Sequence, residues 1–117
     1  MTKPELKQDE FYAGAIINPD GTGNHIILLA GDHEKTTWQD AMDWAKEQGG
    51  DLPNRVESAI LFNQSKAQFK EDWYWTNETH VNDTEWAWGQ NFVNGYQYYY
   101  TKASKLRARA VRRVEIK

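Results

Sequence analysis

Two helix-start signals follow one another in the middle of the chain and constrain its fold more than any other feature. Thr37 and Asp40 have the spacing of a helix N-cap and its reciprocal partner, and Asn54 and Glu57 repeat that spacing. Gly49-Gly50 ends the first helix, because glycine adopts the left-handed conformation at little steric cost. The sequence therefore predicts two short helices, the second of which runs to about residue 66.

Segments typical of β-strands lie on both sides of this helical pair. Residues 11–17 and 25–30 flank a stretch dense in turn-forming residues, which predicts a β-hairpin with its loop at 18–23. Residues 31–35 have the composition of a polar connector. Because a parallel sheet would require helices that alternate with strands, the order of these segments predicts an α+β fold. Four further strands are expected at residues 73–76, 85–90, 97–101 and 108–115, with the last one central in its sheet.

Length and composition indicate one small domain without disulfides. The 117 residues can bury one core, and the absence of cysteine excludes disulfide and thiol chemistry. We expect a flexible lead-in over residues 1–10 and a single domain over residues 11–117. Neither an apolar N-terminal segment nor a long apolar run is visible, so we expect no signal peptide and no membrane span. The expected location is the cytoplasm of a host cell or a virion.

Charge is distributed unevenly along the chain. Residues 101–117 carry seven basic side chains against Glu115 alone, a net charge of +6, so the first hundred residues carry −9 of the total of −3. We interpret the basic segment as an internal counter-charge. Direct nucleic-acid binding is disfavoured, because nucleic-acid binders are usually basic overall. Glu57 is expected to form a structural ion pair with Arg109 or Arg112, since a carboxylate can accept two hydrogen bonds from a guanidinium.

Ten of the sixteen aromatic residues lie within residues 73–100. Trp73 and Trp75 share one face of a strand, as do Trp86 and Trp88, because side chains alternate along a strand. Most of these rings are expected in the core. Four tryptophans on two strands exceed what a small core needs, so one or two are expected to be partly exposed.

A segment rich in tyrosine and amides forms the candidate binding surface. This composition is typical of a paratope, in which rigid rings stand beside adaptable hydrogen-bonding groups. A purely structural hairpin is the alternative interpretation. The candidate residues are Trp88, Asn91, Asn94, Tyr96, Gln97, Tyr98, Tyr99 and Tyr100.

Signals for a metal or for catalysis are sparse. His80, Asn82, Asp83 and Glu85 form a polar cluster whose oxygens could bind a hard cation, although such clusters are equally typical of solvated loops. No nucleophile motif, phosphate-binding loop or zinc-protease motif is present in the sequence. We therefore expect a protein that is not an enzyme and needs no cofactor.

Several segments, taken together in their order, resemble the Lcl C-terminal domain family, which occurs in bacterial surface proteins and in phage proteins. They are residues 49–57 (GGDLPNRVE), 73–78 (WYWTNE), 87–88 (AW), Gly95 and 109–114 (RAVRRV). The resemblance covers roughly residues 11–115. It implies a C-type-lectin-like fold, with two helices packed on a twisted antiparallel sheet.

The calcium-dependent sugar site of C-type lectins does not carry over to this chain. Leu52-Pro53-Asn54 lacks the leading carboxylate or amide of the lectin tripeptide, and Val81-Asn82-Asp83 lacks the lectin tryptophan. The resemblance therefore implies a scaffold rather than a known ligand.

The expected function is that of a non-enzymatic binding module, encoded by a phage or prophage, which recognises a protein or glycan surface through residues 77–100. One alternative is a small inhibitor that blocks a host protein, such as a nucleic-acid-handling defence machine, through its acidic surface. Another is a structural subunit of a virion or adhesin, in which aromatic side chains are buried between identical copies.

Overall fold

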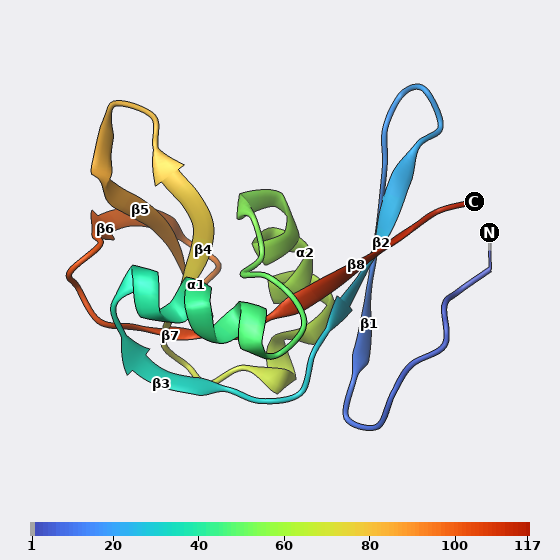
Figure 1. Ribbon diagram of the computed structural model, residues 1–117, viewed down its shortest axis with the longest axis horizontal. Helices are drawn as coiled ribbons and strands as arrows, with labels where there is room; N and C mark the ends of the chain where they lie inside the picture. The colour runs from blue at the N-terminus through green and yellow to red at the C-terminus, as the bar shows by residue number, and fades with distance from the viewer. Residues whose placement is uncertain (1) are drawn as a thin grey trace.

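The structure, a computed structural model, describes residues 2–117 and has an α+β fold built from two antiparallel-dominated sheets and two helices (Figure 1). One sheet has the strand order β1-β2-β8 and the other β3-β7-β4-β5-β6. Among these residues, no helix is long and apolar enough to cross a membrane. The elements are β1 (Phe11–Ile17), β2 (Gly23–Leu28), β3 (His33–Thr36), α1 (Trp38–Glu47), α2 (Arg55–Ser65), a 3₁₀ turn (Lys66–Gln68), β4 (Trp73–His80), β5 (Asp83–Asn91), β6 (Gln97–Thr101), β7 (Leu106–Ala108) and β8 (Val111–Glu115).

Both predicted helix N-caps are confirmed. The Thr37 hydroxyl accepts a hydrogen bond from the backbone N–H of Asp40 at the start of α1. Asn54 caps α2 in a full capping box, in which its side chain accepts from the N–H of Glu57 at 2.7 Å and the Glu57 carboxylate accepts from the N–H of Asn54 at 2.8 Å. These local hydrogen bonds satisfy backbone donors that an α-helix leaves free.

The final predicted strand, residues 108–115, is wrong in two respects. It is two strands in different sheets, and its second part, β8, lies at the edge of the three-stranded sheet rather than in its centre. The chain changes sheet at Arg109-Ala110, where the buried Arg109 guanidinium donates to the backbone carbonyls of Gln68 and Leu29. Only the first part, β7, is central, between β3 and β4.

A strand also occupies the predicted polar connector. β3 pairs with β7, with His33 opposite Ala108 and Thr36 opposite Leu106. Its four residues are polar and only half-buried or exposed, because β3 is the edge of its sheet. Such an edge strand lacks the apolar alternation by which a sequence reveals a strand.

The core lies on both faces of β4, as the alternation of its side chains requires. Trp75 packs with Ala41 and Ala45 of α1, while Tyr74 faces the opposite way and packs with Leu61 of α2 and with Phe92. Trp75 is 1% exposed and Tyr74 is 2% exposed. The two clusters fix α1 and α2 on opposite sides of the same strand.

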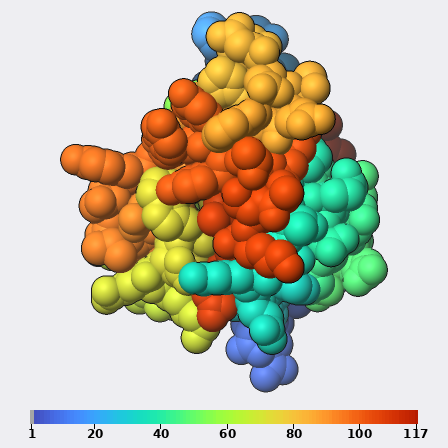
Figure 2. Space-filling view, turned by 90° about the vertical axis from the view of Figure 1, so that its left-hand side faces the viewer, coloured from blue at the N-terminus to red at the C-terminus, as the bar shows by residue number. Residues whose placement is uncertain are grey.

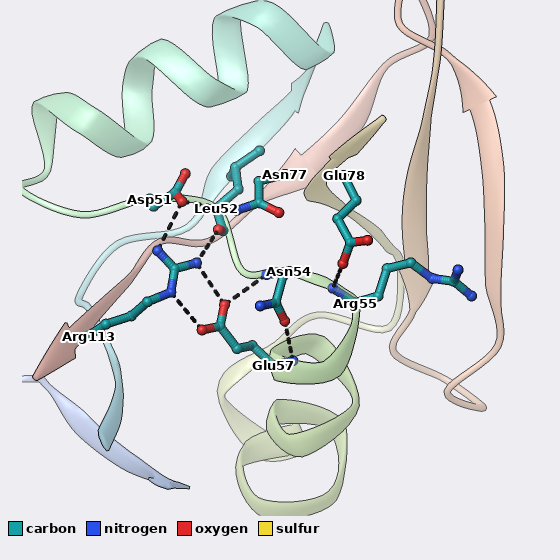
Figure 3. Close-up of polar contacts among 8 residues, drawn as sticks. All are labelled: Asp51, Leu52, Asn54, Arg55, Glu57, Asn77, Glu78 and Arg113. Carbon is teal, nitrogen blue, oxygen red and sulfur yellow. Dashed lines mark hydrogen bonds and ion pairs between the residues drawn. The ribbon is translucent and has the colours of Figure 1, made fainter. Parts of the chain in front are cut away.

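Glu57 forms a structural ion pair as predicted, but its partner is Arg113, so Arg109 and Arg112 were wrong as partners (Figure 3). Arg113 Nε and Nη2 donate to the two Glu57 carboxylate oxygens at 2.6 and 2.8 Å. Arg113 also donates to the carboxylate of Asp51. The hydrogen bonds to Glu57 raise the pKa of Arg113.

The reason for the different partner is strand alternation. Arg112 points to the opposite face of β8 from Arg113 and pairs with Glu10 at 2.9 Å. Arg107 lies near Asp32 and Asp72 in the same way. These pairs confirm the predicted internal counter-charge for three arginines of the basic C-terminal segment, Arg107, Arg112 and Arg113.

The described part of the predicted lead-in, residues 2–10, forms no helix or strand; Met1 lies outside the described residues. Arg112 donates both to the carboxylate of Glu10 and to the backbone carbonyl of Glu5. The hydrogen bonds from Arg112 to the carboxylate lower the pKa of Glu10. Arg112 therefore links residues 2–10 to β8.

We expect Glu57→Gln to lower the free energy of unfolding by about 2 kcal/mol, because glutamine keeps the helix cap but removes the charge that faces Arg113. Urea denaturation monitored by tryptophan fluorescence measures this change. Glu47→Gln, at the exposed end of α1, is the matched control and should change stability little. An unchanged midpoint for Glu57→Gln would contradict the structural role of the pair.

We expect Glu10→Gln to be less stable than the wild type at pH 7 but to approach it in acid. Because the folded-state pKa of Glu10 is lowered, its contribution is complete above the unfolded-state pKa and is lost as the pH falls through the folded-state pKa. Urea denaturation at neutral pH and at about pH 3 measures both differences. Glu5→Gln is the control, since only the backbone of Glu5 contacts Arg112. A difference between wild type and Glu10→Gln that persists unchanged in acid would disprove this role.

Candidate functional site

Four half-buried rings form an aromatic face on one side of the β4-β5-β6 sheet. They are His80, Trp86, Trp88 and Tyr99, and we call them the aromatic face. Trp88 of β5 stands directly opposite Tyr99 of β6, with ring centroids 5.3 Å apart. His80 lies 4.3 Å from the Tyr99 ring, and Trp86 lies 5.7 Å from it. β6 is an edge strand of the five-stranded sheet, and Figure 2 shows residues of β6 at the molecular surface.

Arg55, the first residue of α2, lies flat against this face. Its guanidinium carbon is 3.6 Å from the centre of the Trp88 ring. Its Nε donates to the side-chain carbonyl of Gln97 at 2.9 Å, and Gln97 donates back to the backbone carbonyl of Arg55 at 2.8 Å. The backbone N–H of Arg55 donates to Glu78 of β4 at 2.7 Å (Figure 3). Stacking and these hydrogen bonds hold the arginine in one position.

A cleft of about 650 Å³ opens beside Arg55, between the first turns of α2 and the start of β6. Its polar lining includes groups with spare hydrogen-bonding capacity. Within residues 2–117, the terminal nitrogens of Arg55 and the Oε1 atom of Glu78 have no hydrogen-bond or ion-pair partner. The lining residues are Arg55, Val56, Ala59, Glu78, Gln90, Gly95 and Gln97.

The predicted tyrosines lie in different environments. Tyr96 and Tyr98 are 70% and 52% exposed, whereas Tyr99 belongs to the aromatic face. Tyr100 lies 5.2 Å from Trp73, beside the core, and burial raises the pKa of its hydroxyl. Tyr100 is therefore a structural residue rather than part of an open surface.

The predicted amide residues also have different roles in the structure. Asn91 and Asn94 accept hydrogen bonds from the backbone N–H groups of Val93 and Tyr96, so both stabilise the turn between β5 and β6. Gln97 lines the cleft. The guanidinium of Arg55 covers one face of the Trp88 ring, so that face is closed to a ligand.

The polar cluster His80, Asn82, Asp83 and Glu85 lies at the β4-β5 hairpin: His80 ends β4, Asn82 is in the turn, and Asp83 and Glu85 belong to β5. The backbone N–H of Asn82 donates to the His80 ring, and that of Glu85 donates to Asp83. No group of three or more His, Cys, Asp or Glu side chains that could hold a metal ion occurs within residues 2–117. His80 instead contributes its ring to the aromatic face.

Sequence reasoning did not identify Arg55, Glu78 or the apolar lining residues Val56 and Ala59 as site residues. Arg55 and Gln97 are 42 positions apart, and no local pattern links them. Val56 is 59% exposed at the cleft. The only local signal was the position of Arg55 next to the N-cap Asn54.

The chain matches no protein-family model, and no curated protein sequence matches it. The interpretation of the cleft and the aromatic face therefore depends on their geometry and chemistry.

We expect Gly95→Ala to destabilise the protein more than Gly21→Ala does. Both glycines have a left-handed φ, +82° and +88°, so each substitution should cost about 1 kcal/mol for the backbone alone. At Gly95 the added Cβ would also lie 2.9 Å from the Phe62 ring, whereas at Gly21 it would meet open space. Urea denaturation of the two variants measures the difference. Equal costs would show that Gly95 is not tightly packed against α2.

Proposed function

We propose that this protein is a non-enzymatic binding module that recognises a protein or glycan surface through the aromatic face and the adjoining cleft. The observation that carries this proposal is the fixed position of Arg55 on Trp88, beside a cleft where the terminal nitrogens of Arg55 and the Oε1 atom of Glu78 have no partner within residues 2–117. Held in this way, Arg55 and the rings lose little conformational entropy when a partner binds.

The packing around the aromatic face supports recognition rather than a purely structural role. The largest rings of the core, Trp75 and Tyr74, are fully enclosed, whereas Trp86, Trp88 and Tyr99 remain half-exposed. Exposed aromatic side chains and arginine are the residue types most enriched among binding hot spots. Tyr96 and Tyr98 add exposed apolar area close to the same strand edge.

The wider resemblance fits this proposal. We propose that the scaffold is C-type-lectin-like and related to the Lcl C-terminal domain family, with an origin in a phage or prophage. Two helices packed against curled sheets, and a turn-rich region between β4 and β6, agree with such a scaffold. Recognition without calcium is expected, because the lectin calcium tripeptide is missing from the sequence.

We expect the double variant Trp86→Ala/Tyr99→Ala to weaken ligand binding by about tenfold or more, because truncation of aromatic anchors removes most of the contact energy. A glycan array and a host-lysate pull-down, each run with wild type and variant in parallel, would test this. Ile17→Ala removes an exposed apolar side chain from β1. Because β1 belongs to a different sheet from β5 and β6, this variant should leave binding unchanged.

The outcome that contradicts the proposal is a wild-type protein that binds no glycan and no host protein. A ligand that binds the wild type and the double variant equally would move the recognition site away from the aromatic face. Thermal unfolding of the double variant checks that lost binding does not reflect lost folding.

A further inference from the structure

We propose that the cleft beside Arg55 binds a peptide that carries a carboxylate next to an apolar side chain, as the C-terminal residue of a polypeptide does. This inference rests on the proposed recognition function and names the class of ligand. It follows from the unused charge of Arg55, the single free acceptor of Glu78 and the aliphatic lining of the cleft.

Arg55 differs from the other arginines of the chain because its charge is not used inside the fold. The chain has five arginines, and four of them use their guanidinium groups inside the fold: Arg107, Arg112 and Arg113 pair with carboxylates, and Arg109 donates to backbone carbonyls. Within residues 2–117, no carboxylate oxygen lies within 4.0 Å of the Arg55 guanidinium. In a protein with 17 acidic residues, this arginine is left without a counter-charge.

The geometry of Arg55 suits a carboxylate. Its Nε is occupied by Gln97, and one face of the guanidinium rests on Trp88, so the two terminal nitrogens remain for a ligand. A planar guanidinium with two free N–H groups binds a carboxylate through paired hydrogen bonds, and lysine cannot reproduce that pattern. Because the side chain is already fixed, little rotamer entropy would be lost on binding.

Glu78 supplies the complementary acceptor. Its Oε2 atom is used by the backbone N–H of Arg55, and its Oε1 atom is free within the described residues. Because Arg55 and Glu78 both line the cleft, a free acceptor and a free cation in one cleft fit a ligand that has a donor close to its carboxylate. The last residue of a peptide has this arrangement, because its own amide N–H lies two bonds from the terminal carboxylate carbon.

The aliphatic lining favours a peptide over an acidic sugar. Val56, Ala59 and Gly95 line the cleft, and Val93 and Tyr96, 48% and 70% exposed, lie on the adjacent turn. An apolar side chain would bury this surface. A sugar would instead bring several hydroxyl groups, for which the cleft offers few free partners, since Gln90 and Gln97 are hydrogen-bonded to each other and to α2.

Four small probes test the inference by ¹H–¹⁵N NMR titration of the wild-type protein. They are N-acetyl-Gly-Val-Leu with a free C-terminus, the same peptide as its C-terminal amide, N-acetyl-Gly-Glu-Leu amide, and galacturonic acid. The free acid is expected to shift the Arg55 Nε–H and Gln97 side-chain signals and to bind about tenfold more tightly than the amide. Binding of the glutamate peptide would assign the carboxylate to a side chain instead of a chain terminus.

Two variants test separately how the charge of Arg55 and the open space of the cleft contribute to peptide binding. Arg55→Gln should remove the preference for the free acid, while the matched control Lys46→Gln, which removes an exposed positive charge from α1, should keep it. Ala59→Phe should block the cleft without removing any Arg55 contact, and it should weaken binding of every peptide. Because Ala59 is exposed on α2, we expect this variant to fold.

Equal binding of the free acid and its amide would overturn the inference, as would tighter binding of galacturonic acid than of any peptide. Absence of any peptide-induced shift at Arg55 would also overturn it. In that last case, loss of glycan or protein capture by Trp86→Ala/Tyr99→Ala would still support the general recognition function, so the two proposals fail separately.

Discussion

The carboxylate of Glu57 is the interaction on which the arrangement of the fold depends. One of its oxygens accepts from the backbone of Asn54 and so begins α2, and both oxygens accept from Arg113 of β8. A buried carboxylate with only one partner would be costly, because removal from water is then uncompensated. The two roles together fix the first turn of α2 against the three-stranded sheet. Arg55, which lies in the same helical turn, is thereby placed against the five-stranded sheet.

The candidate site is a consequence of this placement. Arg55 and Glu57 both lie in the first turn of α2, but they face different partners. Glu57 is held by Arg113 of β8 (Figure 3), whereas Arg55 is held by Gln97 and Trp88. Gln90 links the two sheet strands to the helix through Gln97 and the carbonyl of Ser58. The cleft therefore lies at a junction of four elements, α2, β4, β5 and β6, where rigid neighbours fix the side chains that could meet a ligand.

Local features of the fold could be predicted from the sequence, whereas long-range ones could not. Thr37 and Asn54 were correctly placed as helix caps, because a cap is read from residues three positions apart. The change of sheet at Arg109-Ala110 depends on carbonyls supplied by Gln68 and Leu29, which no local pattern reveals. The partner of Glu57 was misjudged for the same kind of reason: the strand register that turns Arg113 toward α2 is set by pairing with β2. The aromatic segment was recognised by composition, but its division into core and surface required the sheet order.

The hydrogen-bond and ion-pair partners of the other arginines show how Arg55 differs from them. The four arginines near the C-terminus lie where three elements meet, so each finds acceptors on a neighbouring strand, turn or terminal segment. Arg55 is also at a junction, yet the carboxylate of Glu78 accepts a hydrogen bond from the Arg55 backbone N–H rather than from the guanidinium. A direct ion pair between these two side chains would have stabilised the fold only slightly, because surface pairs contribute little. With Glu78 held on the helix backbone, the same two residues leave one donor group and one acceptor atom open to the cleft, and the cost to stability is small.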